Sequence, residues 1–287
     1  MIVRAKDRTI EVNDRPLVMG VVNVTPDSFF DGGRYATPEA AIRHALRLAE
    51  EGADLLDIGA ESTRPGSDSI DEGEERRRLM PVVTAVAKAV SIPISVDTMK
   101  ATVARAALEA GAVIVNDVSA LQADPVMAEV VATTGAGVVL MHMQGSPGTM
   151  QNAPVYDDVV GEVAEFFRER VKFCVERGIG QDQIMLDPGI GFGKLLLHNL
   201  TLLGQLETFV SFGRPILVGV SMKSFIGQVV GRPVEERSWG TAAAVALAVS
   251  KGAGILRVHE VAAMKEVVAM AAAITRYAGA SARVQHA

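Results

Sequence analysis

Short apolar runs, each ended by a polar residue, recur along the chain of 287 residues. A glycine, a proline or a Gly-Ala pair leads into each run, and a charged, amide or hydroxyl side chain ends it. Eight such runs are present, at residues 16–23, 53–62, 92–98, 112–117, 136–142, 183–189, 215–221 and 254–260. Because they show no polar/apolar alternation, they predict strands buried on both faces, as in a parallel sheet covered by helices.

Helical patterns lie between most of these runs. Thr37 and Pro38 form a favourable N-cap and first-turn pair before a segment with apolar residues at helical spacing. Gly52 and Gly111 stand where a helix should end, directly before the next apolar run. Further segments with helical spacing are 101–110, 159–176 and 241–250.

Eight βα units in one chain of this length predict an α/β fold, a single (β/α)8 TIM barrel over residues 1–287. A doubly wound open sheet is the alternative, but no GxGxxG motif follows the first run. Residues 1–14 predict an N-terminal β-hairpin, with its turn at residues 6–8, that closes the bottom of the barrel. Residues 279–287 are expected to form a loose tail.

The composition narrows the class of protein. Apolar residues make up 49% and charged residues 22%, which indicates a large core and no general disorder. The net charge of −6 argues against a nucleic-acid partner. Cys174 is the only cysteine, which excludes a disulfide framework and suits a reducing compartment. With no signal-peptide pattern and no bilayer-spanning apolar run, we expect a cytoplasmic protein without a membrane partner.

The polar residues that end the runs are candidates for a functional site. In a barrel, the carboxyl ends of the strands and the loops that follow them meet at one face, where active sites lie. We therefore expect a site built from Asn23, Glu61, Asp97, Asn116, His142, Asp187, Lys223, Arg257 and His259.

One subset suits a flat heterocycle. Asp97, Asn116 and Asp187 offer acceptors for an amino-amide edge, and Lys223 offers a donor for a ring carbonyl. A metal site is the alternative for the two aspartates, although no suitably spaced His or Glu group accompanies them.

A second subset suits a diphosphate. Asn23, Arg257 and His259 end the first and last runs, which are neighbours in a closed barrel. Mg²⁺ commonly accompanies phosphates while using few protein ligands. The long loops 23–33 and 59–68 are expected to be binding loops, because long loops after barrel strands usually serve a function.

Seven motifs follow one another along nearly the whole chain: VNVTPDSFFDGG, GAESTRPG, SVDT, NDVS, LDPGIGFGK, KSFIG and RVHE. Together they resemble the dihydropteroate synthase family. The resemblance implies a homodimeric transferase of folate biosynthesis and a target of sulfonamides. Its members condense 6-hydroxymethyl-7,8-dihydropterin diphosphate with 4-aminobenzoate to give 7,8-dihydropteroate and diphosphate.

The resemblance also implies roles for residues. The pterin is expected to contact Asp97, Asn116, Met141, Asp187 and Lys223. The diphosphate is expected at Asn23, Thr63, Arg257 and His259, with Mg²⁺ near Asn23. The aminobenzoate is expected at Thr63, Arg64, Pro65, Phe192 and Ser224, beside the start of a helix at 224–231. The catalytic set is expected to be Asp97, Lys223, Arg257, Asp31 and Arg64.

The implied mechanism is dissociative: diphosphate leaves first, and the amine then attacks a methylene cation that the pterin delocalises. The sequence departs from the family where Met222 stands in place of the usual arginine, and Leu195 in place of a frequent threonine. Alternatives are a pterin-binding methyltransferase that uses methyltetrahydrofolate, a Schiff-base aldolase through Lys223, and a non-catalytic pterin-binding homologue.

Overall fold

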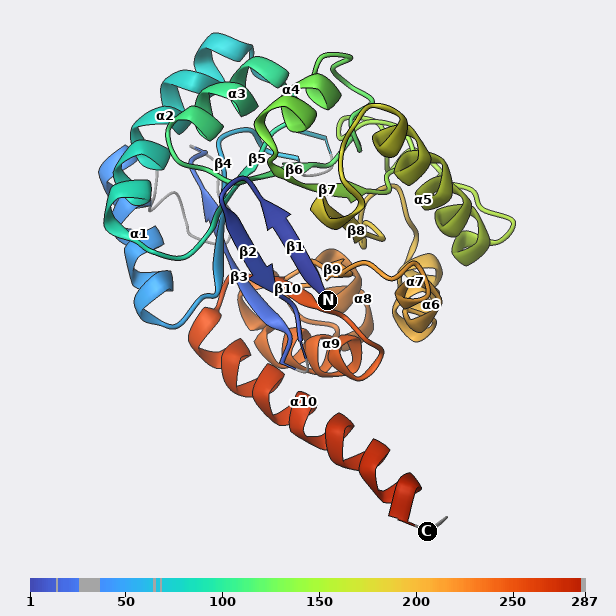
Figure 1. The fold of residues 1–287 in the computed structure, drawn as a ribbon. Helices are drawn as coiled ribbons and strands as arrows, with labels where there is room; N and C mark the ends of the chain where they lie inside the picture. The colour runs from blue at the N-terminus through green and yellow to red at the C-terminus, as the bar shows by residue number, and fades with distance from the viewer. Residues whose placement is uncertain (14, 26–36, 64–65, 68, 285–287) are drawn as a thin grey trace.

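The structure, a computed structural model, describes residues 1–13, 15–25, 37–63, 66–67 and 69–284, with side chains to residue 277. Eight parallel strands form the central sheet, in the order β8-β7-β6-β5-β4-β3-β10-β9. A bridge between Leu186 and Ile216 joins the two outer strands of this order, so the sheet closes into a barrel. The predicted (β/α)8 barrel is confirmed (Figure 1).

All eight predicted strands are present. They are β3 (Leu17–Asn23), β4 (Leu55–Gly59), β5 (Ile94–Asp97), β6 (Ile114–Asp117), β7 (Gly137–Met141), β8 (Ile184–Asp187), β9 (Leu217–Val218) and β10 (Ile255–Val258). Almost every residue in them is buried, as expected for strands that face the barrel interior on one side and helices on the other.

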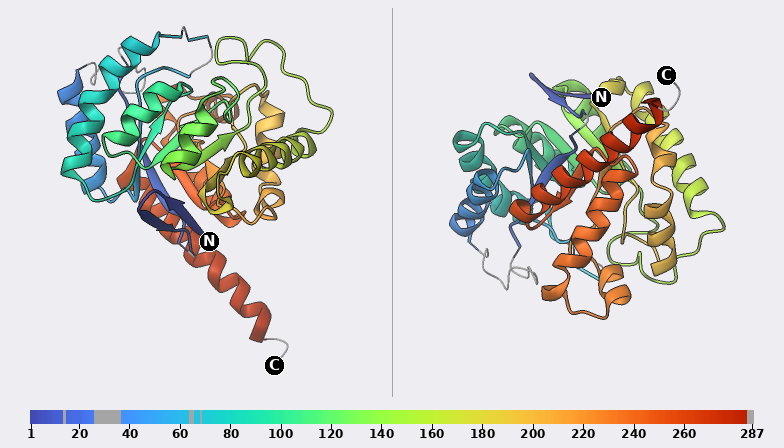
Figure 2. Two further views of the ribbon diagram at one scale, coloured as in Figure 1. Left: turned by 45° about the horizontal axis from the view of Figure 1, so that its top comes forward. Right: turned by 90° about the horizontal axis from the view of Figure 1, so that it is seen from below.

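Helices surround the barrel (Figures 1 and 2). They are α1 (Pro38–Glu50), α2 (Glu72–Ala89), α3 (Ala101–Glu109), α4 (Met127–Thr134), α5 (Val159–Glu176), α6 (Leu196–Gly204), α7 (Glu207–Val210), α8 (Ser224–Val230), α9 (Ser238–Ser250) and α10 (Val261–Val284). Thr37 caps α1 as predicted, because its side chain accepts a hydrogen bond from the Ala40 amide. Gly52 and Gly111 follow α1 and α3 with φ of 93° and 117°, which a glycine tolerates.

Two predictions about helix ends need correction. Helix α9 begins at Ser238, three residues before the predicted start at residue 241. Helix α10 continues to Val284, so most of the predicted loose tail at 279–287 is helical. Figure 2 shows that this helix runs alongside α9 and then extends beyond the barrel. Among the described residues, no helix is both long enough and apolar enough to cross a bilayer.

The N-terminal hairpin pairs β1 (Ile2–Ala5) with β2 (Arg8–Glu11) and lies across the front of the barrel in Figure 1. Its inward residues, Val3 and Ile10 among them, join a buried cluster with interior side chains such as Met19 and Leu55. The Lys6 amide donates to the Gly135 carbonyl at 2.7 Å, which fixes the turn against the end of α4. The predicted closure of the barrel bottom is therefore confirmed.

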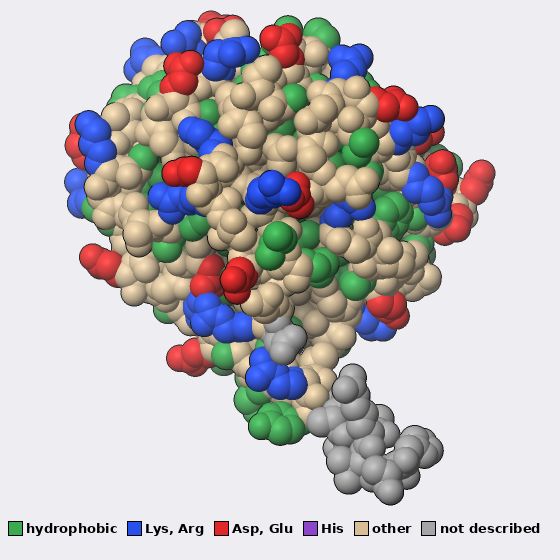
Figure 3. Space-filling model, in the orientation of Figure 1, with side chains coloured by type: hydrophobic (Ala, Val, Ile, Leu, Met, Phe, Trp, Pro, Cys, Tyr) green, Lys and Arg blue, Asp and Glu red, His purple; other side chains and the backbone are tan. Residues whose placement is uncertain are grey.

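Lysine and arginine side chains alternate with aspartate and glutamate on the hairpin face (Figure 3). No large area of one sign appears on that face.

Candidate active site at the carboxyl end of the barrel

A buried ion cluster occupies the centre of the barrel mouth. The Nε of Arg257 donates to Asp57 Oδ2 at 2.7 Å, and its Nη2 donates to Asp97 Oδ2 at 3.0 Å. Asn116 Nδ2 also donates to Asp57 Oδ2 at 3.0 Å. Burial and the neighbouring Asp57 raise the pKa of Asp97 to about 8, although Arg257 opposes the rise. This mouth therefore holds two buried carboxyl groups around one guanidinium.

The sheet register brings these groups together. Gly59, Asp97 and Asn116 are aligned neighbours at the ends of β4, β5 and β6. A Cβ on residue 59 would lie 3.1 Å from the Asp97 Cβ, closer than almost all real contacts. Glycine at this position thus leaves the space that the Asp97 side chain occupies.

Asp187 and Lys223 form the second part of the mouth. Asp187 Oδ1 accepts a hydrogen bond from the Gly189 amide at 2.7 Å. The pKa of Asp187 is raised by burial, and the Lys223 charge opposes this. Lys223 donates to the Ile190 carbonyl, and its Nζ lies 4.7 Å from the centre of the Phe192 ring. Burial lowers the pKa of Lys223 to about 8, while Asp187 favours its charged form.

A third group lies where β3 and β10 are neighbours. His259 Nδ1 and Ser221 Oγ are 3.0 Å apart, and the Ser221 hydroxyl also accepts from the His259 amide at 3.3 Å. Asn23 ends β3 and is half-buried. Thr63, in the loop after β4, is half-buried too.

An open cavity of about 570 Å³ lies over the ends of β5, β6 and β7, and of the predicted site residues Glu61 and Met141 line it. Met141 and Val118 line it on the barrel side, and Glu61 and Ser67 line it from the loop after β4. A cavity of this volume accommodates a small-molecule ligand.

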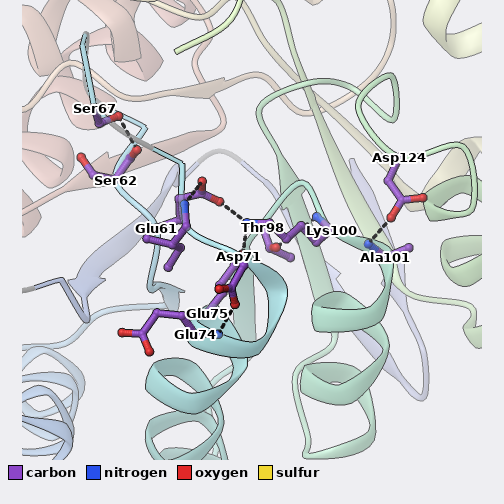
Figure 4. A network of polar contacts seen from close by, with 11 residues as sticks. Glu61, Ser62, Ser67, Asp71, Glu74, Glu75, Thr98, Lys100, Ala101 and Asp124 are labelled. Atoms are coloured by element: carbon purple, nitrogen blue, oxygen red, sulfur yellow. Dashed lines mark hydrogen bonds and ion pairs between the residues drawn. The ribbon is translucent and has the colours of Figure 1, made fainter. Parts of the chain in front are cut away.

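Behind that loop, Lys100 joins two carboxylates (Figure 4). Its Nζ lies 2.5 Å from Glu61 Oε2 and 2.6 Å from Glu75 Oε2. The other oxygen of Glu61 accepts from the Ile70 amide at 3.2 Å. Ser67 Oγ donates to the Ser62 carbonyl at 2.6 Å. The loop after β4 is therefore held near its start, at Glu61, and near its end, at Ile70.

The chain is similar to proteins of known activity. Residues 19–259 match the model of the family described as pterin binding enzyme. A dihydropteroate synthase of Synechocystis sp. is 45% identical over 263 residues, covering 91% of each chain.

Solved structures agree. A dihydropteroate synthase of Yersinia pestis, in a sulfonamide drug complex, has a TM-score of 0.92 and 44% identity, covering 96% of this chain and 99% of that one. The enzyme of Xanthomonas albilineans, in complex with 7,8-dihydropteroate, has a TM-score of 0.85 and 44% identity, covering 94% and 98%. This chain belongs to the dihydropteroate synthase family. The predicted family and transferase activity are thereby confirmed.

In this member of the family the fold brings most of the predicted site residues to one end of the barrel. Asp97, Asn116 and Arg257 share one hydrogen-bonded cluster, and Lys223 lies against Phe192. Ser224 is exposed at the first turn of α8. The predicted residues Asp31, Arg64 and Pro65 lie outside the described residues, as do Phe29 and Phe30 of the first long loop.

Two strand-end residues of the predicted set belong to supporting contacts. Glu61 is bound to Lys100, and His142 Nδ1 lies 2.9 Å from the Nζ of Lys194. Each of these side chains is therefore bound to a lysine and not to the cluster around Arg257.

Asp57, which is 0% exposed and bonds both Arg257 and Asn116, was not among the predicted residues. Neither were Lys100 and the contacts of Lys194. A signal for Asp57 was present, because a charged residue inside an otherwise apolar strand is rarely buried without a partner.

Met222, where the resemblance leads us to expect an arginine, is buried beside α9. Met222 is 5% exposed, and its sulfur lies 3.8 Å from the Thr241 hydroxyl of α9. Its backbone has φ of 61°, and its carbonyl accepts from Arg237 Nη1 at 3.0 Å. Met222 thus packs between the mouth and α9 as an apolar core residue.

Proposed function

We propose that the described mouth binds 6-hydroxymethyl-7,8-dihydropterin diphosphate and 4-aminobenzoate and condenses them to 7,8-dihydropteroate and diphosphate. The observation that carries this proposal is the set of buried polar groups from different strands around one small volume. Burial strengthens their interaction with a charged or polar ligand, because the local dielectric is low.

The pterin takes the inner position. Asp187 and Asn116 accept from its amino-amide edge, and Lys223 donates to its carbonyl. Met141, which is 3% exposed at the end of β7, packs against the flat ring. Asp97 and its partner Arg257 lie at the side of the ring where charge changes during the reaction.

The chemistry needs no nucleophile on the enzyme. The bond between the methylene carbon and the diphosphate oxygen breaks, and its electron pair leaves with diphosphate. The resulting cation is delocalised into the pterin, and the buried carboxylates stabilise this positive charge. The amine of 4-aminobenzoate then forms the new C–N bond and loses one proton.

The diphosphate lies at Asn23, Thr63 and His259, with Arg257 supplying positive charge. Among the described residues there is no group of three or more His, Cys, Asp or Glu side chains that could hold a metal ion. Mg²⁺ usually keeps several waters and uses substrate phosphates with few protein ligands, so the amide oxygen of Asn23 fits it. Mg²⁺, when bound there, would neutralise part of the charge on the leaving diphosphate.

The aminobenzoate lies over Phe192, with Ser224 and Thr63 at its edges and Lys223 above the Phe192 ring. The proposed roles of Asp31, Arg64 and Pro65 remain predictions, as these residues lie outside the described part.

We also propose that the enzyme is a homodimer and works in the cytoplasm. Exposed apolar side chains gather on the neighbouring helices α9 and α10, with Trp239 88% exposed and Leu247, Met270 and Ile274 each more than half exposed. A second copy would bury this surface. The single cysteine, Cys174, is buried as a free thiol, which suits a reducing compartment.

The role of Asp187 provides a test. Asp187→Asn should lower kcat/KM about a hundredfold, because the buried group loses the charge that favours the pterin cation. Asp182→Asn is a matched control, since this residue pairs with Arg4 at the opposite end of the barrel. A near-wild-type kcat/KM for Asp187→Asn would contradict the proposed pterin site.

A further inference from the structure

The segment 189–194, between β8 and α6, has an unusual hydrogen-bond pattern. Five consecutive carbonyls, those of residues 190 to 194, each accept a hydrogen bond from a side chain. The donors are Lys223 to Ile190, Gln151 to Gly191 at 2.9 Å, Lys194 to Phe192 at 2.9 Å, Tyr156 to Gly193 at 2.8 Å, and Asn199 to Lys194 at 3.2 Å. Side chains thus replace the partners that a helix or a sheet would supply.

Glycines allow the segment to pack against the end of β7 and the chain after it. Gly189 and Gly193 have φ of 67° and 59°. A Cβ on residue 189 would lie 1.9 Å from the His142 carbonyl oxygen. A Cβ on residue 193 would lie 2.5 Å from the Gln144 carbonyl oxygen. The backbone position of the segment is therefore narrowly fixed.

Lys194 is the most buried donor, with 3% of its surface exposed. Its Nζ lies 2.9 Å from the Phe192 carbonyl, 3.2 Å from the His142 carbonyl and 2.9 Å from His142 Nδ1. An ammonium group has three donors, which matches three acceptors. Burial lowers the pKa of Lys194 to about 7, while Asp187 favours the charged form.

A buried lysine surrounded by neutral acceptors is costly, so its position requires an explanation. Lys194 bonds both the carbonyl of Phe192 and His142, the first residue after β7, and so joins these two segments. The ring of Phe192 is the surface on which Lys223 Nζ rests at 4.7 Å. Movement of the Phe192 backbone would therefore displace both the ring and its contact with Lys223.

We propose that Lys194 is a positioning residue for the aminobenzoate: it fixes Phe192 through the backbone of segment 189–194 and does not touch substrate. This inference rests on the proposed function of Phe192. It predicts that loss of the Lys194 ammonium weakens aminobenzoate binding far more than pterin binding. Asp97 and Asn116 are held outside the segment, and Asp187 and Lys223 bond to Gly189 and Ile190, which Lys194 does not contact through a hydrogen bond.

The test compares Lys194→Met with Lys172→Met, a control at an exposed lysine of α5. We expect the KM for 4-aminobenzoate to rise at least tenfold, since a charge-assisted hydrogen bond is lost, and the KM for the pterin diphosphate to change less than threefold. Equal changes in both KM values, or wild-type values, would overturn the inference.

Tyr156→Phe provides a second variant that keeps the ring and removes only the hydrogen bond to Gly193. It should raise the KM for 4-aminobenzoate about threefold without changing the KM for the pterin, and an unchanged aminobenzoate KM would count against the inference. Amide hydrogen exchange in residues 189–194 should accelerate in Lys194→Met. If the wild-type protein lacks turnover, the proposed function fails. If amide exchange in residues 189–194 is unchanged in Lys194→Met, the role of Lys194 is refuted independently of the proposed function.

Discussion

Removal of the Arg257 guanidinium tests the buried cluster most sharply. In Arg257→Met, the carboxylates of Asp57 and Asp97 would face each other without the cation that now bonds both, at 2.7 and 3.0 Å. Breaking a buried ion pair by removing one partner typically costs about 3–5 kcal/mol. For a chain of this length that corresponds to a fall of about 5–8 °C in Tm.

The loss should depend on pH. In the variant, the pKa of Asp97 rises further above its unfolded-state value, because Arg257 no longer opposes burial and the repulsion from Asp57. Wild-type Asp97 has a pKa of about 8, so at lower pH the native states of both proteins hold it protonated, and its penalty is the same in both. The difference from wild type should therefore be larger at pH 9.5, where Asp97 ionises more readily in wild type than in the variant, than at pH 6.

Urea unfolding at pH 9.5 and pH 6 would measure the free energy of unfolding of wild type, Arg257→Met, Asp57→Asn and the double variant. The double variant should be more stable than Arg257→Met at pH 9.5, because only one buried charge then lacks its partner. An equal loss at both pH values, or a double variant no more stable than Arg257→Met, would refute the reasoning.

Three further predictions concern single side chains. Asp57→Asn should lower kcat/KM at least tenfold, because Arg257 loses one of its charged partners, and an unchanged value in a diphosphate-release assay would argue that Asp57 is only structural. Lys100→Met should lower the free energy of unfolding by about 3 kcal/mol at pH 8 and by less at pH 5, since its two buried carboxylate partners lose their cation; a pH-independent loss in urea unfolding would contradict this. Val3→Ala should lower the free energy of unfolding by about 2 kcal/mol in the same assay, whereas Ile2→Ala, on the exposed side of the hairpin, should lower it by less than about 0.5 kcal/mol. Similar losses for both variants would contradict the barrel-closing role of the hairpin.

The fold was predictable because each strand is short, apolar and followed by a polar residue. The strand around Leu217 shows the limit of that signal, since only two residues, Leu217 and Val218, form regular ladder pairs. The end of α10 was not predictable from propensity, because alanine-rich and serine-containing tails suit both a helix and a coil.

The site was predictable only where its residues end a strand. Asp57 escaped notice because it lies within an apolar run, where its register partner on β5 is Ser95, and only its hydrogen bonds to Arg257 and Asn116 place it in the cluster. The contact between Lys194 and His142 joins residues 52 positions apart, and nothing in local sequence gives that distance. Lys100 likewise meets partners 25 and 39 positions away. Such contacts depend on how the barrel closes.

Diphosphate release from 6-hydroxymethyl-7,8-dihydropterin diphosphate with Mg²⁺, measured with and without 4-aminobenzoate and then with a sulfonamide, would test the proposed condensation. We predict release that depends on 4-aminobenzoate and yields 7,8-dihydropteroate in equal amount. The sulfonamide should inhibit it in competition with 4-aminobenzoate. Binding of the pterin without any aminobenzoate-dependent release would contradict the proposed condensation.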